Sequence, residues 1–588
     1  MKRKMIFGLL VSAGVARAGE RPAFRIPWTR QIRGLPVIKK RLSSAAVLAV
    51  SGALLAGVPL GNPVFREEIL AKMTFDFGST GGIYATGDSK CRIIPGGGEG
   101  SRGVLEVYNR TENWNSGEFN LTGKVESGRN YRFTAKVRQD AVPEGTFQLS
   151  LKIEDGSGVH YELVRRGTGA KGVWTELSGE YRLGAGVKKL YPYIELYGSK
   201  DTFLIDDVVF TDLEAEERDT ALEAELPALK DAFAAAGLYA GASVGDAVLG
   251  DVTGVQKRLA LKHFNVIAPE NQLKAQFLLD RATSLKDLAA CQTDAALDFT
   301  APTPWFEFAK ANGLRINAQA LVWHMLTPEW WFHVDYDVAK PLASRETMLL
   351  RLENYIRRVL GWCESNYPGL VRSWVVVNEG VDGDAKPHVR DDLFFKTIGE
   401  DYIAKGFEFA GKYRPKTDCT FLYNDYNMEY YVEKTDFVLD YLKRHDLISR
   451  KLVDGIGFQA HLHIGWPGLK EIRKNCAKVA KAGLMAEVTE LDVKFGLSEV
   501  KDFPSVEAAM ARQATRYERL VRTFLEARQA GLDLRGICWW GLTDGYTWLT
   551  DFHSERNFPL LFDRDNKAKP AFHGVLKAVK EMGMEKVK

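Results

Sequence analysis

The chain has 588 residues, too many for one ordinary hydrophobic core, so we expect two domains and additional segments. A hydrophobic content of 45% and a charged content of 26% are ordinary for a globular protein. The formal net charge is +3, but residues 1–60 carry about +10, which leaves about −7 for residues 61–588. An acidic body of this kind excludes the electrostatic pattern of nucleic-acid binding.

The basic start of the chain has the order of an export signal. Residues 38–61 begin with Lys and Arg, continue as an apolar run and end in small residues, and residues 1–18 repeat this order in shorter form. We therefore predict that residues 1–61 are a cleaved targeting leader, with a true start near Val37 as one explanation of the repetition. The alternative is a membrane-anchoring helix over 44–60, which is short for a span. Export predicts an extracellular, periplasmic or cell-surface protein without stable membrane insertion.

The six cysteines are scattered along the chain and form no C-x-x-C pair, which argues against a zinc site. In an exported protein they form either one or two disulfides or remain buried free thiols, and their spacing does not decide the pairing. No organic cofactor is indicated, and a monomer is expected.

Residues 73–212 have the pattern of an antiparallel β-sandwich, jelly-roll-like in kind. Alternating or aromatic-rich runs, such as residues 130–139 and 146–155, are separated by turns rich in Gly, Asn and Asp. A charged, helix-like stretch follows, and we assign residues 213–224 to a linker that leads into the next domain.

The sequence pattern is different in residues 225–583, where short apolar runs alternate with long helical patterns. Eight such runs with helical crossovers predict a (β/α)8 TIM barrel, since parallel strands buried on both faces read as apolar throughout. The predicted strands are 239–245, 264–270, 316–324, 373–379, 420–425, 455–462, 484–493 and 536–542.

Polar residues collect where these apolar runs end. In a TIM barrel the chemistry lies at the carboxyl ends of the strands, so these side chains converge on one mouth. A single Glu at a strand end is most often a solvated cap, but clusters at seven ends indicate a site. Glu379 and Glu490 end or occupy the fourth and seventh strands. Cleavage of a glycosidic bond needs two carboxyl groups of this kind.

Seven short motifs accompany these strand ends. Residues 374–379 read W-V-V-V-N-E and residues 489–492 read T-E-L-D. Five further motifs follow in register: E-N-Q-L-K (270–274), L-V-W-H (321–324), Y-N-D-Y-N (423–427), D-G-I-G-F-Q-A-H-L (454–462) and W-W-G-L-T-D-G-Y-T-W (539–548). Together they resemble the motifs of glycoside hydrolase family 10, the endo-β-1,4-xylanases. The resemblance implies a retaining hydrolase that cleaves internal β-1,4-xylosidic bonds of xylan.

By this resemblance Glu379 is the acid/base, with a raised pKa before it protonates the leaving oxygen, and Glu490 is the nucleophile. Asn378 binds the sugar 2-OH, His461 holds Glu490, and Gln459 lies beside the pair. The other residues expected to bind sugar are Glu270, Asn271, Lys274, His324, Tyr426, Trp540 and Trp548.

Two of these neighbours have a competing interpretation. Trp540 either walls the sugar pocket or fills the barrel core. Asp492 is expected to orient its neighbours rather than to touch substrate.

Several positions depart from the family pattern. Val375 replaces the usual Asp after Trp374, and Gln319-Ala320 replaces His-Thr before L-V-W-H. None of these changes removes a catalytic carboxylate, but each alters the polar surroundings and so the pKa values or rates. The alternatives are therefore a β-glucanase or cellulase on the same barrel, or a non-catalytic polysaccharide-binding protein.

The front domain resembles a carbohydrate-binding module of family 22, through residues 107–121, 130–138 and 203–210. The resemblance implies a xylan-binding cleft lined by Trp114, Tyr161, Tyr193 and Glu195. The alternative is that the aromatic residues fill the sandwich core.

An Arg that this family often places after a Gly-Trp turn is not found around residues 81–87, so the domain is either a weak binder or a spacer. Such sandwiches commonly hold a structural Ca²⁺, and I-D-D at 205–207 either supplies a ligand or forms a capped turn.

Overall fold

The structure is a computed structural model. It describes residues 65–73, 75, 83–87, 89–95, 103–122, 124–216, 225–245, 248–249, 254–553 and 555–583. The predicted leader, the alternative anchor helix and the proposed start near Val37 lie outside the described residues. Within the described ranges, no helix is long and apolar enough to cross a membrane.

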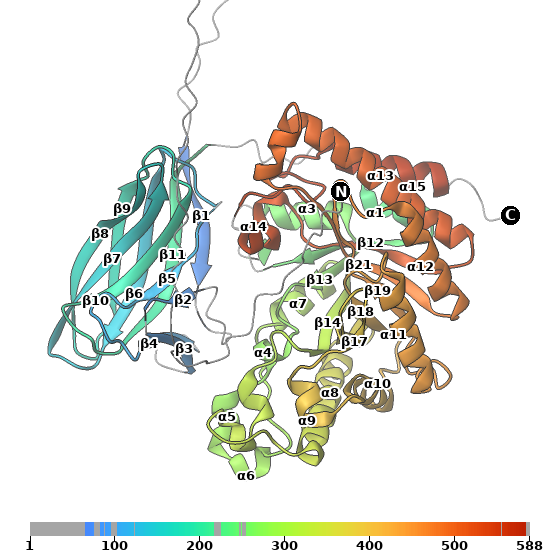
Figure 1. The fold of residues 1–588 in the computed structure, drawn as a ribbon, viewed down its shortest axis with the longest axis horizontal. Helices are drawn as coiled ribbons and strands as arrows, with labels where there is room; N and C mark the ends of the chain where they lie inside the picture. The colour runs from blue at the N-terminus through green and yellow to red at the C-terminus, as the bar shows by residue number, and fades with distance from the viewer. Residues whose placement is uncertain are drawn as a thin grey trace, which may run out of the picture. The chain divides into compact units, whose positions relative to one another are not determined.

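Two antiparallel sheets form the N-terminal domain (Figure 1). One sheet has the order β3-β4-β11-β6-β9 with β1 paired to β11, and the other has the order β2-β5-β10-β7-β8. The strands are β1 (Phe65–Met73), β2 (Ile83–Ala85), β3 (Lys90–Pro95), β4 (Gly103–Tyr108), β5 (Gly117–Phe119), β6 (Asn130–Gln139), β7 (Glu144–Asp155), β8 (Gly158–Ala170), β9 (Thr175–Arg182), β10 (Lys189–Tyr197) and β11 (Phe203–Glu216).

The sandwich forms because its strands alternate between core and surface. In β6 every second side chain is buried, and these side chains meet those of the opposite sheet in one hydrophobic core. Phe147 of one sheet and Phe203 of the other contact edge to face, with ring centroids 6.0 Å apart. The predicted sandwich is confirmed.

The predicted domain edges need correction. β1 begins at Phe65, eight residues before the expected start, and β11 continues through the first four residues of the predicted linker. Pairing of β1 with β11 explains both extensions, because each strand supplies backbone partners to the other. Residues 217–224 are not described, and the first helix, α1, spans Leu229–Ala235.

The second domain is a closed ring of eight parallel strands. The order β19-β18-β15-β14-β13-β12-β22-β21 is closed by pairing of β19 with β21, while β20 (His461–His463) pairs only with β21. The ring strands are β12 (Tyr239–Val244), β13 (Val266–Pro269), β14 (Arg315–Trp323), β15 (Val371–Asn378), β18 (Thr420–Asp425), β19 (Gly455–Phe458), β21 (Met485–Lys494) and β22 (Asp533–Trp539). The TIM barrel is confirmed, with strands close to those predicted.

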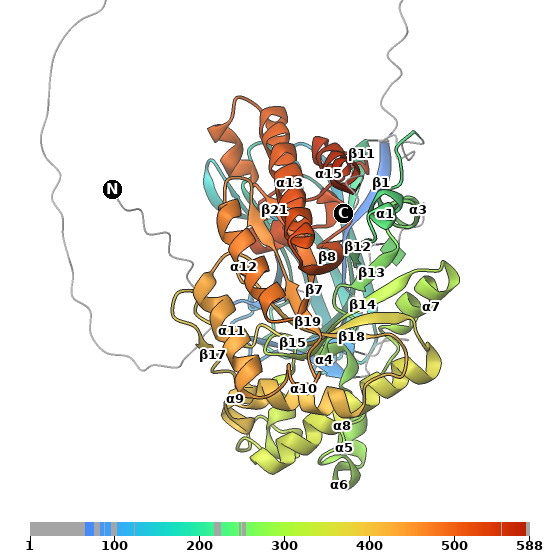
Figure 2. The same ribbon diagram turned by 90° about the vertical axis from the view of Figure 1, so that its right-hand side faces the viewer.

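Helices surround the ring (Figure 2). The long helices α8 and α13 both begin at a serine, Ser344 or Ser505, whose side chain accepts a backbone N–H of the first turn. The helices after α1 are α3 (Val255–His263), α4 (Ala275–Leu278), α5 (Arg281–Lys286), α6 (Leu288–Cys291), α7 (Thr303–Ala311), α8 (Arg345–Asn366), α9 (Leu393–Ile398), α10 (Tyr402–Lys412), α11 (Val432–Arg444), α12 (Leu469–Lys481), α13 (Val506–Gln529), α14 (Trp548–His553) and α15 (Pro570–Gly583).

All six cysteines are free, and four of them are buried. Of the two open possibilities, the structure therefore favours free thiols over disulfides.

Candidate active site

The two predicted catalytic carboxylates come from strands β15 and β21 of the ring. Glu379 directly follows β15 and has a φ of +54°, a conformation that turns the chain sharply out of the strand. Its backbone N–H donates to the carbonyl of Asn424 on the adjacent strand β18, at 2.9 Å. Glu490 lies within β21 and is only 5% exposed. The opening of the barrel thus holds one carboxylate at a bent strand end and one in a regular strand.

Glu490 is held by an amide and an imidazole. Asn424 Nδ2 donates to Glu490 Oε1 at 2.8 Å, and His461 Nε2 lies 3.2 Å from Oε2. His461 Nδ1 lies 2.8 Å from Asp492 Oδ2, and Trp548 Nε1 donates to the same oxygen at 3.1 Å. The expected positioning role of His461 and the orienting role of Asp492 fit this geometry.

The histidine between the two carboxylates is favoured in its charged form. Burial lowers the pKa of His461, but Asp492 and Glu490 outweigh burial and raise the pKa to about 10. Both ring nitrogens then carry protons, so each donates to one carboxylate. Glu490 therefore faces a positively charged donor, which holds the carboxylate in place for its proposed attack.

Glu379 takes part in a network of side-chain amides. Gln459 Nε2 donates to Glu379 Oε1 at 2.9 Å, and Asn378 Nδ2 lies 3.2 Å from the same oxygen. Asn378 Oδ1 accepts from Asn424 Nδ2 at 2.7 Å, and Asn424 also binds Glu490. Two amide side chains therefore connect the two carboxylates. Asn424 was not predicted as a site residue, although its position inside the motif Y-N-D-Y-N was an available signal.

The surroundings of Glu379 within the protein lower its pKa, whereas the expected rise refers to the carboxyl group facing a bound sugar. Burial raises the pKa of this carboxyl, but the nearby His324, the Gln459 hydrogen bond and the charge of Arg390 together lower it below its ordinary value. Burial also lowers the pKa of His324 itself, to about 4. The motif could not reveal this balance, because the donors come from several different strands.

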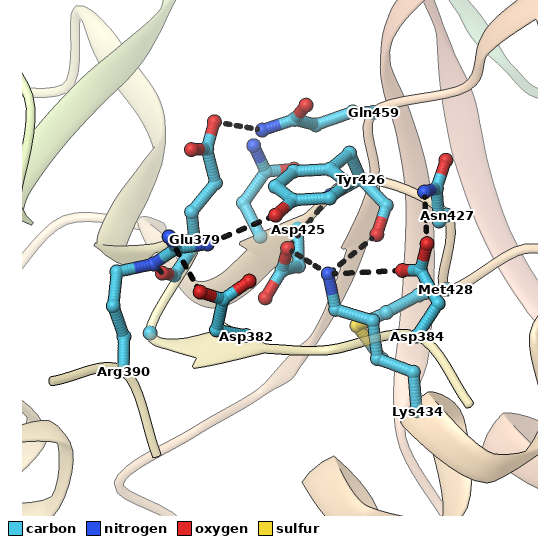
Figure 3. A network of polar contacts seen from close by, with 12 residues as sticks. Glu379, Asp382, Asp384, Arg390, Asp425, Tyr426, Asn427, Met428, Lys434 and Gln459 are labelled. Atoms are coloured by element: carbon cyan, nitrogen blue, oxygen red, sulfur yellow. Dashed lines mark hydrogen bonds and ion pairs between the residues drawn. The ribbon is translucent and has the colours of Figure 1, made fainter. Parts of the chain in front are cut away.

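Arg390 links Glu379 to a second polar network (Figure 3). Its Nε donates to the Glu379 carbonyl at 2.8 Å, and its Nη2 donates to the Tyr426 hydroxyl at 2.9 Å. Lys434 Nζ lies 3.6 Å from the Tyr426 ring centroid and 2.7 Å from Asp425. Tyr426 therefore lies beside the site, with its hydroxyl engaged by Arg390. Arg390 follows the small hairpin of β16 (Val381–Asp382) and β17 (His388–Val389), and no predicted motif included it.

The side chain of Lys274 lies close to residues at the ends of the second, third and eighth barrel strands. Its Nζ donates to Asn271 at 3.1 Å and lies 4.5 Å from the Trp323 ring and 5.8 Å from the Trp540 ring. Burial lowers the pKa of Lys274, while Glu270 and both catalytic carboxylates oppose that change. The predicted sugar-binding residues of these strands therefore lie near Glu379 and Glu490.

The aromatic residues of the eighth strand have mixed surroundings. Trp540 is only 8% exposed and packs in a small hydrophobic cluster with Tyr239 and Cys538, so the core interpretation holds for much of its surface. Trp548 is partly exposed, and its ring centroid lies 5.0 Å from that of His461. His324 is largely buried, and its Nδ1 has no hydrogen-bond partner among the described residues.

The sandwich carries a second candidate site, a cavity of about 640 Å³ lined by all four predicted binding residues. Trp114 is 52% and Tyr161 64% exposed, so the alternative that they fill the core is wrong. Tyr193 contacts Tyr161 edge to face with centroids 6.3 Å apart, and Glu195 lies at the cavity wall. Exposed flat rings beside a carboxylate suit stacking on, and hydrogen bonding to, a sugar chain.

The loop that carries Trp114 is held in place by side-chain hydrogen bonds of Arg110 and Asn115. Buried Arg110 donates to the carbonyls of Asn113, Asn115 and Leu196 at 2.7–3.0 Å. Asn115 Oδ1 accepts the backbone N–H groups of residues 111 and 112 at 2.9 Å. The ring of Trp114 therefore projects from an ordered turn.

The residues offered for Ca²⁺ do not form a suitable donor set. The Asp207 carboxylate pairs with Lys136 at 2.8 Å, and Asp206 accepts the backbone N–H of Asp207. Within the described ranges, no group of three or more His, Cys, Asp or Glu residues could hold a metal ion.

A TIM barrel with two carboxylates joined by amides at its mouth defines the class of glycoside hydrolases. The sequence pattern of glycosyl hydrolase family 10 matches residues 228–578, and that of a carbohydrate binding domain matches residues 67–201. This chain belongs to glycosyl hydrolase family 10.

Similar proteins include endo-1,4-beta-xylanase B of Butyrivibrio fibrisolvens, 38% identical over 327 residues, which is 55% of this chain and 49% of that protein. Endo-1,4-beta-xylanase A of Thermotoga maritima is 31% identical over 482 residues, which is 80% of this chain and 43% of that protein. The chain thus spans about half the length of the curated relatives it matches.

Solved structures agree on the fold. The intracellular xylanase of Thermoanaerobacterium saccharolyticum has a TM-score of 0.52 at 29% identity and covers 60% of this chain with its whole length. The CBM22-1–GH10 modules of Clostridium thermocellum xylanase 10B, complexed with xylohexaose, have a TM-score of 0.53 at 24% identity. They cover 87% of this chain and 97% of their own, and at this identity the likeness concerns the fold alone.

Proposed function

We propose that this chain is a secreted endo-β-1,4-xylanase that cleaves internal bonds of xylan with retention of anomeric configuration. The observation that carries the proposal is the pair Glu379 and Glu490, joined through Asn378 and Asn424 at the barrel mouth. Membership of family 10 and relatives named endo-1,4-beta-xylanase support xylan as substrate.

In the first step Glu379 protonates the leaving glycosidic oxygen while Glu490 attacks the anomeric carbon, so that a covalent glycosyl-enzyme forms. Asn424 and protonated His461 hold Glu490 for this attack. The protein's own groups lower the pKa of Glu379, and we propose that a bound sugar raises it by excluding water from the carboxyl group.

In the second step ionised Glu379 takes a proton from water, which displaces the sugar from Glu490. The groups that lower the pKa of Glu379 favour its ionised form, which this step requires. Asn378 contacts Glu379 directly and Glu490 only through Asn424, and we assign Asn378 to the 2-OH of the reacting sugar.

The sandwich is proposed to hold xylan chains against Trp114, Tyr161 and Tyr193, in the cavity described above. We further propose an exported monomer without organic cofactor, without nucleic-acid partners and without membrane insertion after processing. The order of the first 61 residues supports export.

A β-glucanase is the second candidate. A relative from Acetivibrio thermocellus, 29% identical over 80% of this chain, is named an exoglucanase. Glucose differs from xylose by one hydroxymethyl group, so Trp548 beside His461 is the residue expected to exclude it.

The test is reducing-end release from soluble glucuronoxylan, and from barley β-glucan, by the wild-type chain and Glu490→Gln. We expect release from xylan that the substitution abolishes, and proton NMR of early products should show the β-anomer. Preferential cleavage of glucan would favour the second candidate. Equal xylan turnover by Glu490→Gln would contradict the role of Glu490, and binding without turnover by wild type would favour the non-catalytic alternative.

A further inference from the structure

The carboxylate of Glu195 is buried, yet it forms part of the wall of the sandwich cavity. Glu195 lies on β10, is 7% exposed and lines the cavity together with Trp114 and Tyr161. Burial raises the pKa of Glu195, and a hydrogen bond from Gln148 and the charges of Arg110 and Arg166 offset only part of this rise. Without those partners, burial would favour the neutral acid.

The partners form a relay across three strands. Gln148 Nε2 on β7 donates to Glu195 Oε1, in direct register with it on β10. Arg166 on β8 donates from Nε, at 2.9 Å, and from Nη2 to Gln148 Oε1. Arg166 also stacks on Tyr197, with its Cζ 4.5 Å from the ring centroid.

The relay fixes the direction of an amide that could otherwise turn over. A guanidinium has only donors, so Gln148 must turn its oxygen toward Arg166 and its NH₂ toward Glu195. Glu195 Oε1 is thereby occupied, and Oε2 has no hydrogen-bond partner among the described residues, so it is available to a sugar hydroxyl. A free amide could instead present its oxygen to the carboxylate and repel it.

We propose that Arg166, acting through Gln148, is a positioning residue that sets Glu195 as an ionised acceptor for xylan hydroxyls in the sandwich cavity. This inference rests on the proposed xylan binding of the sandwich. It also supplies a guanidinium to a domain that lacks the Arg expected near residues 81–87, although Arg166 comes from a different strand.

The test compares full-length chains that all carry Glu490→Gln, so that the ligand is not cleaved. Arg166→Met is the test variant. Arg165→Met is the matched control, because Arg165 is the preceding exposed residue of β8 and makes no contact with Gln148. Gln148→Met interrupts the relay while leaving Arg166 on Tyr197, and Trp114→Ala measures the share of binding due to the sandwich.

Affinity for soluble xylan is measured by affinity electrophoresis at pH 5 to 8. We expect Arg166→Met and Gln148→Met to bind about fivefold more weakly, as for loss of one well-placed hydrogen bond, and Arg165→Met to bind like the parent. In Arg166→Met the loss should be larger at pH 5 than at pH 8, because the pKa of Glu195 rises further. Arg110 and Tyr193 also face Glu195 and are unchanged in every variant.

The possible outcomes distinguish failure of the proposed xylan binding by the sandwich from failure of the proposed relay through Arg166 and Gln148. If Trp114→Ala binds as tightly as the parent, the sandwich does not bind xylan and the proposed function of that domain fails. If Trp114→Ala weakens binding but Arg166→Met does not, or if Arg165→Met weakens it equally, the relay is overturned. Thermal unfolding identifies any variant that does not fold, and in that case Gln148→Met decides alone.

Discussion

The barrel mouth and the sandwich cavity use the same kinds of residue in opposite ways. In the barrel, Glu490 is buried and held by an amide and a charged imidazole, and most of the surface of Trp540 is covered. In the sandwich, Trp114 and Tyr161 are more than half exposed, and a single buried carboxylate serves them. Chemistry requires groups whose charge and position are fixed, whereas binding requires open flat surface. Each prediction below changes one side of this contrast.

The largest effect is expected from removal of the proposed acid. Glu379→Ala should slow hydrolysis of xylan by up to about 10⁴-fold, because the leaving sugar oxygen needs a proton. An aryl xyloside with a good leaving group needs little protonation, so its bond cleavage should slow far less. Because Glu379 also serves the second step, the measurement is kcat/KM, which reports the first step, on the two substrates; an equal loss of kcat/KM on both would contradict the acid role. Binding of xylan by the sandwich should be unchanged.

The second largest effect is expected on stability, from the buried carboxyl group of Glu429. Glu429 is fully buried, and neither carboxylate oxygen has a hydrogen-bond partner among the described residues. Burial raises the pKa of Glu429 from 4.5 to about 7. In the unfolded chain this group ionises near pH 4.5, so the free energy of unfolding falls as the pH rises from about 4.5 through 7, by up to about 3 kcal/mol. At Glu195 the hydrogen bond from Gln148 and the nearby arginines offset part of the corresponding effect of burial.

Glu429→Gln should therefore unfold at a higher temperature than wild type at pH 8 and at a similar temperature at pH 4.5. Thermal unfolding across this pH range checks the prediction. Exposed Glu433→Gln is the control and should change stability little at any pH. A constant difference between Glu429→Gln and wild type would show that Glu429 does not titrate in this range.

A smaller effect is expected for the support of the nucleophile. Asp492→Asn removes the carboxylate that raises the pKa of His461, so the pKa falls toward its ordinary value. The imidazole then loses its proton near neutral pH and no longer donates to both sides. We expect about 10- to 100-fold slower turnover at pH 8, with a smaller loss at pH 5. The pH profile of kcat/KM measures this.

The comparison for this change is Trp548→Phe, which removes the indole N–H donated to Asp492 together with part of the ring but leaves the Asp492 carboxylate in place. The alkaline limb of the pH profile of kcat/KM should be close to that of wild type in Trp548→Phe. If Asp492→Asn slowed the enzyme equally at pH 5 and pH 8, His461 would not be acting through its charge.

The sequence indicated the main residues of both sites but not the supporting contacts that join distant segments, for a physical reason. Parallel strands buried on both faces read as apolar runs, and their polar ends stand beside them in the chain, as in Asn378-Glu379. The sandwich relay joins residues 148, 166 and 195, which come together only through strand register. Arg390 was not predicted for a similar reason, because it follows the β16–β17 hairpin and donates from there to the Glu379 carbonyl. Likewise, the direction of the Glu379 pKa depended on neighbours from other strands.

The smallest effect is expected at the exposed ring of the sandwich. Trp114→Ala should weaken binding to insoluble xylan about tenfold, because one stacking face is lost while the cavity walls remain. Turnover of short soluble xylo-oligosaccharides should not change, since the barrel acts on them without the sandwich. Val173→Ala, an exposed change on the same domain, is the control and should bind like wild type. A Trp114→Ala variant that lost turnover on short substrates as strongly as binding would break the division between an open binding surface and a buried catalytic one.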